Sequence, residues 1–86
     1  MLVTVYTKNY CPKCEHLKIS LEEIGVHYEV RPTEVNSNRW DMQAKGHQLL
    51  PVLRMIKDNN EFTEYTKGFT KKNLRAIMRK HGVEVK

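Results

Sequence analysis

The order of apolar patterns at the start of the chain constrains the fold more than any other feature. Residues 2–6 (LVTVY) are apolar and β-branched, as a buried strand should be. A helical pattern follows over residues 12–24, and Pro12 suits its first position because that position needs no backbone N–H. Residues 26–30 (VHYEV) alternate as a second strand, which is expected to end before Pro32. A strand, a helix and a strand in this order predict a right-handed parallel crossover.

The rest of the chain adds a helix, a hairpin and a last helix. Residues 36–46 begin with capping residues and end at a glycine, which indicates a helix with a thin apolar face. Residues 51–56 and 61–65 read as strands joined by the turn 57–60, and such a pair forms an antiparallel hairpin. The C-terminal helix is marked by Leu74, Ile77 and Met78 and is ended by Gly82. The order β-α-β-α-β-β-α predicts an α/β fold, in which helices flank a mixed four-stranded sheet.

Size and charge narrow the classes of function. With 86 residues, of which 40% are hydrophobic, the chain is expected to form a single domain over residues 1–86. No apolar run approaches the roughly 20 residues of a membrane helix, and the start lacks a signal-peptide pattern, which favours a cytoplasmic protein. The net charge is +5, but the basic stretch 71–82 fits a solvated helix face and no known nucleic-acid motif. We expect a monomer that binds neither nucleic acid nor membrane, whereas an acidic protein tail suits the charge.

The two cysteines, Cys11 and Cys14, are separated by only two residues. A disulfide between them closes too short a loop to constrain the unfolded chain much, so a purely structural role is disfavoured. A metal site wants about four ligands, usually from two such pairs. The histidines match no zinc spacing, because His16 diverges from Cys14 and the others fall in a strand, a loop and a helix end: His27, His47 and His81. We expect no metal site, although a metal or iron–sulfur carrier remains the alternative of another class.

The position of the pair favours thiol chemistry. Cys11 precedes Pro12 and therefore occupies the N-cap of the helix, where the backbone N–H groups of Lys13 and Cys14 can point at its sulfur. These donors, the helix dipole and the charges of Lys8 and Lys13 are expected to lower the pKa of the Cys11 thiol. Cys14 lies one turn deeper on the same face. Cys11 is thus predicted to attack a target disulfide, and Cys14 to resolve the mixed disulfide.

Three segments resemble a known family. The stretch 5–14 (VYTKNYCPKC) is similar to the redox motif of glutaredoxins, and especially of the small glutaredoxin-like proteins called NrdH-type redoxins. The similarity continues through 45–53 (KGHQLLPVL) and 68–74 (GFTKKNL), in the same order along the chain. The resemblance implies a thioredoxin fold, a redox-active disulfide between Cys11 and Cys14, and no bound cofactor.

The resemblance also implies a binding site beside the cysteines. It implies that Leu50–Pro51 is a cis peptide, which turns the backbone of Leu50 toward a bound peptide. In glutaredoxins the region of Gly68 holds a carboxylate of glutathione, and Thr70 can cap the last helix and leave backbone donors for an anion. The candidate substrate-binding residues are therefore Tyr10, Leu50, Pro51, Gly68, Phe69 and Thr70.

The chain departs from the glutaredoxin pattern at three places that concern glutathione. Lys13 stands where glutaredoxins usually have tyrosine, and Leu49 and Leu50 replace a threonine–valine pair. Lys71 and Lys72 replace an acidic pair that can hold the amino group of glutathione. The NrdH-type pattern is also imperfect, because its tryptophan before the Gly-Phe turn and its Arg-Pro-Asp after that turn are missing.

Two electron sources stay open from the sequence. The Cys-Pro-Lys-Cys motif and the lost acidic pair favour a dithiol reductant of ribonucleotide reductase that thioredoxin reductase recharges. Pro12 and Lys8 favour a glutaredoxin that uses glutathione as reductant. In both cases the partner is a protein with a disulfide, and the reaction is dithiol–disulfide exchange.

Overall fold

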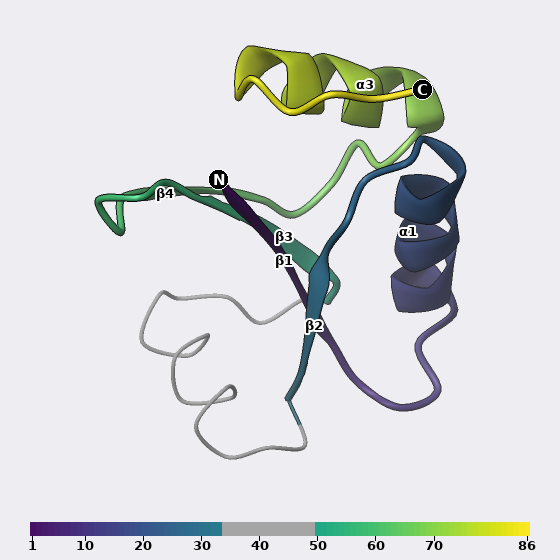
Figure 1. Cartoon of the computed structure of the whole chain (residues 1–86). Coiled ribbons are helices and arrows are strands. Elements are labelled where there is room, and N and C mark those ends of the chain that lie inside the picture. Colours follow the sequence, from purple (N-terminus) through teal and green to yellow (C-terminus); the bar gives the residue numbers. More distant parts are fainter. Residues whose placement is uncertain (34–49) are drawn as a thin grey trace.

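A computed structural model of the chain describes residues 1–33 and 50–86. Four strands form one mixed sheet in the order β2-β1-β3-β4 (Figure 1). β1 (Leu2–Thr7) pairs in parallel with β2 (Glu29–Pro32) and antiparallel with β3 (Val52–Ile56), which in turn pairs antiparallel with β4 (Phe62–Tyr65). The parallel pair is joined by a helix, and the antiparallel pair β3–β4 is the predicted hairpin, so the predicted sheet is confirmed.

Two helices cover one face of this sheet. Helix α1 (Pro12–Glu23) and helix α3 (Lys71–Lys80) pack on the side chains that β1 and β3 direct to that face (Figure 1). Burying these aliphatic side chains stabilises the fold by roughly 1.5–3 kcal/mol each. The strand residues are Val3, Val5, Leu53 and Met55, and the helix residues are Leu17, Leu21, Leu74 and Met78. The core therefore fixes both helices on the same side, and the first turn of α1 lies at the end of β1.

The other face of the sheet carries a buried charged side chain. Arg54 of β3 is only 4% exposed, and its guanidinium donates two hydrogen bonds to Oε2 of Glu64, at 3.0 and 2.8 Å. It also donates to the hydroxyl of the fully buried Tyr6 at 2.8 Å. The guanidinium carbon lies 4.7 Å from the centre of the Tyr6 ring and 4.5 Å from that of Phe62. Arg54 thus links β1 and β4 across β3.

The second strand begins later than the sequence predicted. Instead of residues 26–30, β2 covers Glu29–Pro32, because the turn after α1 extends further. Gly25 has a φ of 77°, and the backbone N–H of Val26 donates to the carbonyl of Leu21 at 3.0 Å. His27 consequently lies in the connection and not in the strand. Pro32 is part of β2, where its missing N–H is tolerated because β2 is an edge strand.

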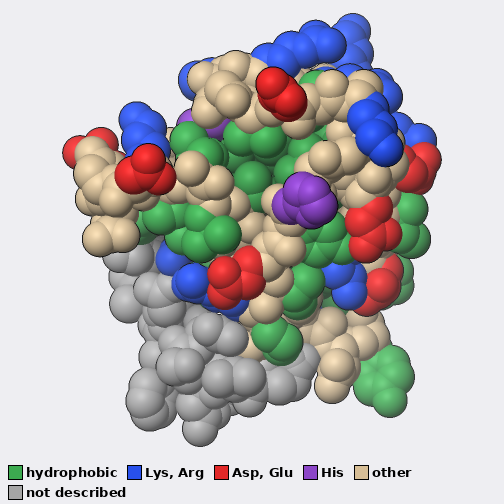
Figure 2. Space-filling model, viewed as in Figure 1, with side chains coloured by type: hydrophobic (Ala, Val, Ile, Leu, Met, Phe, Trp, Pro, Cys, Tyr) green, Lys and Arg blue, Asp and Glu red, His purple; other side chains and the backbone are tan. Residues whose placement is uncertain are grey.

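The other predicted elements are largely as expected. The helix predicted over 12–24 is α1, and the C-terminal helix is α3, with His81 as its C-cap and Gly82 just beyond. The helix predicted over 36–46 lies outside the described residues, as does His47. Lys and Arg side chains gather at the surface over α3, as expected for a solvated basic face (Figure 2). Within residues 1–33 and 50–86, no helix is long and apolar enough to span a membrane.

Candidate redox site

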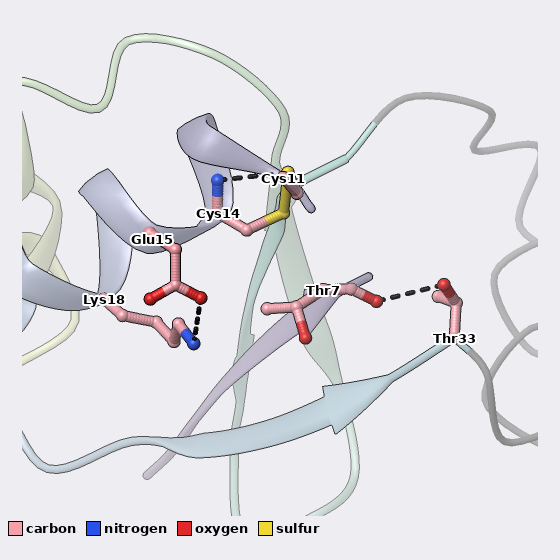
Figure 3. Close-up of a disulfide and its surroundings, with 6 residues drawn as sticks. All are labelled: Thr7, Cys11, Cys14, Glu15, Lys18 and Thr33. Carbon is pink, nitrogen blue, oxygen red and sulfur yellow. Dashed lines mark hydrogen bonds and ion pairs between the residues drawn. A yellow bond between two sulfur atoms is a disulfide. The ribbon is translucent and has the colours of Figure 1, made fainter. Parts of the chain in front are cut away.

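The two cysteines form a disulfide at the first turn of α1, with their Cα atoms 5.2 Å apart. Cys11 is the N-cap, with extended backbone at φ −114° and ψ 95°, and Pro12 opens the helix, as predicted. The backbone N–H of Cys14 donates to Sγ of Cys11 at 3.2 Å (Figure 3). The backbone N–H of Lys13 was expected to point at the same sulfur. Among the described residues no such hydrogen bond is found, so this part of the prediction was wrong. One helix amide therefore points at the Cys11 sulfur.

Cys11 is more exposed to solvent than Cys14, as predicted. Cys11 is 7% exposed, whereas Cys14 is completely buried beneath the first turn of the helix. Cys11 is therefore the more exposed of the two cysteines, although both are largely buried.

Two hydrogen bonds from Thr33 fix the end of β1, the strand that leads to the disulfide. The carbonyl of Thr7, at the end of β1, accepts from the backbone N–H of Thr33 at 2.8 Å and from its hydroxyl at 3.0 Å (Figure 3). Between Thr7 and the helix, Tyr10 has a left-handed backbone with a φ of 56°. Its side chain is fully exposed. The loop thus places a large aromatic side chain in solvent directly beside Cys11.

A groove of about 630 Å³ runs from the first turn of α1 to the start of α3. The peptide Leu50–Pro51 is cis, which confirms the expectation from the resemblance. Gly68 has a φ of 78°, a conformation that glycine adopts without steric cost. The hydroxyl of Thr70 accepts from the backbone N–H of Asn73 at 3.2 Å, and Thr70 is the predicted N-cap of α3. The residues lining the groove are Pro12, Lys13, His16, Leu50, Pro51, Thr66, Lys67, Gly68, Phe69 and Thr70.

A second cavity of about 550 Å³, which we call the Tyr10 hollow, borders Cys11 on the side of β2. Its lining is Thr7, Lys8, Asn9, Tyr10, Cys11, Pro12, Glu15, Lys18, Val30 and Pro32. Pro12 is shared with the groove, so the two cavities meet at the start of α1. The Glu15 carboxylate is paired with Lys18 at 2.7 Å (Figure 3).

The structure brings most of the candidate residues together but divides them between these two cavities. Leu50, Pro51, Gly68, Phe69 and Thr70 line the groove, whereas Tyr10 lines the hollow. The two lysines expected to act on the sulfur are also separated: Lys8 lines the hollow and Lys13 lines the groove. Phe69 additionally packs against the core, so it serves both the groove and the fold.

Several lining residues were not among the candidates. His16 follows Pro12 by one helical turn, so the i, i+4 spacing would have placed it on the same face. Lys67 directly precedes Gly68, and its position next to this candidate residue could have identified it. Val30 and Pro32 reach the hollow only through the pairing of β2 with β1, which has no local signal.

No three or more His, Cys, Asp or Glu side chains are grouped to hold a metal ion within the described ranges, 1–33 and 50–86. His16 lies at the groove, His27 is exposed in the connection before β2, and His81 caps α3. Cys11 and Cys14 are bonded to each other. The chemistry that this arrangement offers is the two-electron exchange of a dithiol and a disulfide.

Comparisons with known proteins agree with this geometry. The NrdH-redoxin from Escherichia coli, described as a glutaredoxin-like protein with a thioredoxin-like activity profile, has a similar structure. The TM-score is 0.71 and the identity 26%, over 90% of this chain and 95% of that one. The thioredoxin-like protein BC3987 shares the fold, with TM-scores of 0.67 for a mutant form and 0.62 for the form without the mutation. Identities are 20% and 21%, over 88% and 87% of this chain and 97% of each of theirs.

No curated protein matches the chain. The glutaredoxin family model matches residues 3–58, which include β1 from its second residue on, the cysteine pair, α1, β2 and β3. With its mixed sheet, its two described helices and its disulfide at the start of α1, the chain belongs to the glutaredoxin family and has a thioredoxin-like fold.

Proposed function

We propose that the protein is a dithiol–disulfide oxidoreductase that reduces disulfides in partner proteins. The observation that carries the proposal is the asymmetric pair at the start of α1. Cys11 is the more exposed cysteine and its sulfur accepts a helix N–H, whereas Cys14 is buried one turn later. A thiolate is the attacking species in disulfide exchange, and a helix N-terminus favours it.

The reaction proceeds in two exchanges. The Cys11 thiolate attacks one sulfur of the target disulfide, and the electron pair of the broken bond leaves with the other sulfur, which takes a proton from solvent. The Cys14 thiolate then attacks Sγ of Cys11 and releases the second target thiol. Two electrons have moved from the dithiol to the target, and Cys11 and Cys14 end in the disulfide that the structure contains.

Substitution of each cysteine tests the division of roles. We expect Cys14→Ser to accumulate a mixed disulfide between Cys11 and the target, because nothing displaces the product. Cys11→Ser should neither trap the target nor reduce it. Mass spectrometry of the unreduced reaction mixture measures both outcomes, and equal trapping by the two variants would contradict the assignment.

We further propose that the electrons come from thioredoxin reductase and pass to ribonucleotide reductase. The likeness to an NrdH-redoxin with a thioredoxin-like activity profile supports this choice. The groove supports it too, because Lys13 and Lys67 line it without an acidic side chain among its described residues. The glutathione amino group would therefore meet positive charge at this surface.

The second candidate function is reduction by glutathione. It is supported by the groove beside the disulfide, where Thr70 caps the N-terminus of α3. The oxidised protein should be offered NADPH with thioredoxin reductase, and in parallel glutathione with glutathione reductase. NADPH consumption in the first system alone supports our proposal, and consumption in the second alone supports the glutaredoxin activity.

A further inference from the structure

The conformation and exposure of Tyr10, at the Tyr10 hollow, are not explained by the stability of the fold. Tyr10 is fully exposed and has a backbone φ of 56°, a left-handed conformation that is unfavourable for a bulky side chain. In the free protein the ring covers no core residue, so its burial does not offset that conformational cost. Strained residues beside reactive groups are often retained because they contact a ligand. Tyrosine is also among the residues that contribute most energy to protein interfaces.

The neighbours of Tyr10 make the hollow suitable for an apolar side chain. Val30 is 38% exposed at the edge strand, and Pro12 and Pro32 complete an apolar wall. Cys11 lines the same cavity, so any group bound there lies beside the reactive sulfur.

Cys11 lines the hollow but not the groove, and the two cavities share Pro12, the residue that follows Cys11. A partner segment whose cysteine bonds to Cys11 continues in both directions from that cysteine. Its residues beside the bonded cysteine therefore meet the hollow, and residues that pass Pro12 reach the groove. The hollow is thus continuous with the surface that the proposed reaction already requires.

The charges around the two cavities indicate which net charge the bound partner segment carries. Lys8 lines the hollow, and Lys13 and Lys67 line the groove, and none of them forms an ion pair within residues 1–33 and 50–86. The one carboxylate among the described lining residues, that of Glu15, is already paired with Lys18. Positive charge is therefore in excess, which attracts an acidic segment.

We propose that the Tyr10 hollow is a second docking subsite, in which Tyr10 binds an apolar side chain close to the cysteine of an acidic partner segment. This inference rests on the proposed function, since it concerns the protein whose disulfide is reduced. It assigns Tyr10, together with Val30 and the two prolines, to substrate selection.

Two synthetic peptides test the proposal, Glu-Leu-Glu-Cys-Glu-Leu-Glu and the same peptide with alanine in place of leucine. Each cysteine is joined to thionitrobenzoate in a mixed disulfide. The Cys11 thiolate attacks the peptide sulfur, and the electron pair leaves with the coloured thionitrobenzoate. Cys14 then attacks Cys11 and frees the peptide thiol. The measured quantity is the ratio of the two second-order rate constants, leucine peptide over alanine peptide.

We expect this ratio to be about tenfold in the native protein, which corresponds to about 1.4 kcal/mol. Tyr10→Ala should lower it clearly but not to one, because the second leucine still meets the groove, while Tyr10→Phe should keep it, because the ring and not the hydroxyl makes the contact. Ile19→Ala is the matched control, since Ile19 is an exposed apolar residue of α1 outside both cavities. A change in the reactivity of Cys11 alters both rates together and leaves the ratio unchanged.

The outcomes separate this inference from the proposed function. If both peptides release thionitrobenzoate but the native ratio is near one, or if Tyr10→Ala keeps the native ratio, the docking subsite is disproved and the oxidoreductase stands. If the reduced native protein releases none from either peptide, the proposed function fails and the subsite fails with it.

Discussion

At the scale of single residues, Arg54 has the most demanding environment in the described structure. A buried guanidinium needs partners for its charge and its N–H groups, because transfer from water is costly. Glu64 supplies the opposite charge, and the Tyr6 hydroxyl and two aromatic rings surround the rest of the group. These contacts join β1, β3 and β4 on the face of the sheet opposite α1 and α3.

Replacing Arg54 should therefore be among the most destabilising substitutions in this chain. We expect Arg54→Met to lower the free energy of unfolding by about 3–5 kcal/mol, because it removes the buried guanidinium that pairs with the Glu64 carboxylate. Urea denaturation followed by circular dichroism measures the loss. The double variant Arg54→Met/Glu64→Gln should recover part of it, since it also removes the carboxylate charge that Arg54 balances. A single variant as stable as the native protein would contradict this account.

The residues of the disulfide could be predicted from sequence, whereas those of the Arg54 cluster were not. Capping by Cys11 and initiation by Pro12 depend on a few adjacent residues, so a local pattern specifies them. Arg54 and Glu64 are ten positions apart and meet only because β3 and β4 pair in one register. Their partnership depends on strand pairing, which the sequence pattern predicted without its register.

At the scale of elements, the end of α3 is tied to the hairpin by a histidine. The ring of His81, the C-cap of α3, lies edge-on to that of Tyr65 in β4, and its Nε2 is 2.9 Å from the Tyr65 hydroxyl. Burial lowers the pKa of His81 below its usual 6.5, and the positive charges of Lys80 and Lys57 lower it further. The folded protein therefore favours the neutral ring.

This lowered pKa makes stability depend on pH in a defined direction. Between the folded pKa of His81 and 6.5, the unfolded chain binds more protons than the folded one, so stability rises with pH and falls on acidification. Ring-proton NMR titration should give a folded pKa below 6.5. Lys57→Gln should raise that pKa, because it removes a nearby positive charge, whereas Lys8→Gln serves as the charge-matched control. A His81 pKa at or above 6.5 in the native protein would refute the assignment.

The order of elements was predictable, but one boundary was not. The alternation of residues 26–30 resembles a strand, yet the chain is still turning there, with Val26 bonded to Leu21 and Gly25 in a left-handed conformation. Where β2 starts is decided by its pairing with β1, in which Glu29 faces Thr4. Periodicity identifies the kind of element, and the tertiary pairing fixes its ends.

At the scale of the whole molecule, the net charge of +5 affects how partners approach. Lysines on both sides of Cys11 add to this field where the reaction is proposed to occur. The range of such attraction is about 8 Å at physiological ionic strength and shortens as salt is added. Charge should therefore influence the rate of encounter more than the chemistry of exchange.

Salt should accordingly slow the reduction of acidic substrates. We expect the second-order rate constant for the glutamate–leucine peptide to fall by roughly threefold or more from low to high sodium chloride concentration. The same peptide with lysine in place of glutamate should be slower at low salt and should become faster as salt is added. Stopped-flow measurement of thionitrobenzoate release gives both rates. Parallel salt dependence of the two peptides would rule out steering by the lysines.

The meeting of two cavities at Pro12 has a consequence for protein engineering. The hollow is built by the loop after β1, by α1 and by β2, whereas the groove is built by α1 and by the segments before β3 and α3. Apart from Pro12, the two sets share no lining residue among those that the structure describes. Substitutions can therefore change the sequence preference on one side of the attacked cysteine without altering the other. The substrate preference of a small redoxin of this kind can therefore be changed in two separate steps, one for the hollow and one for the groove.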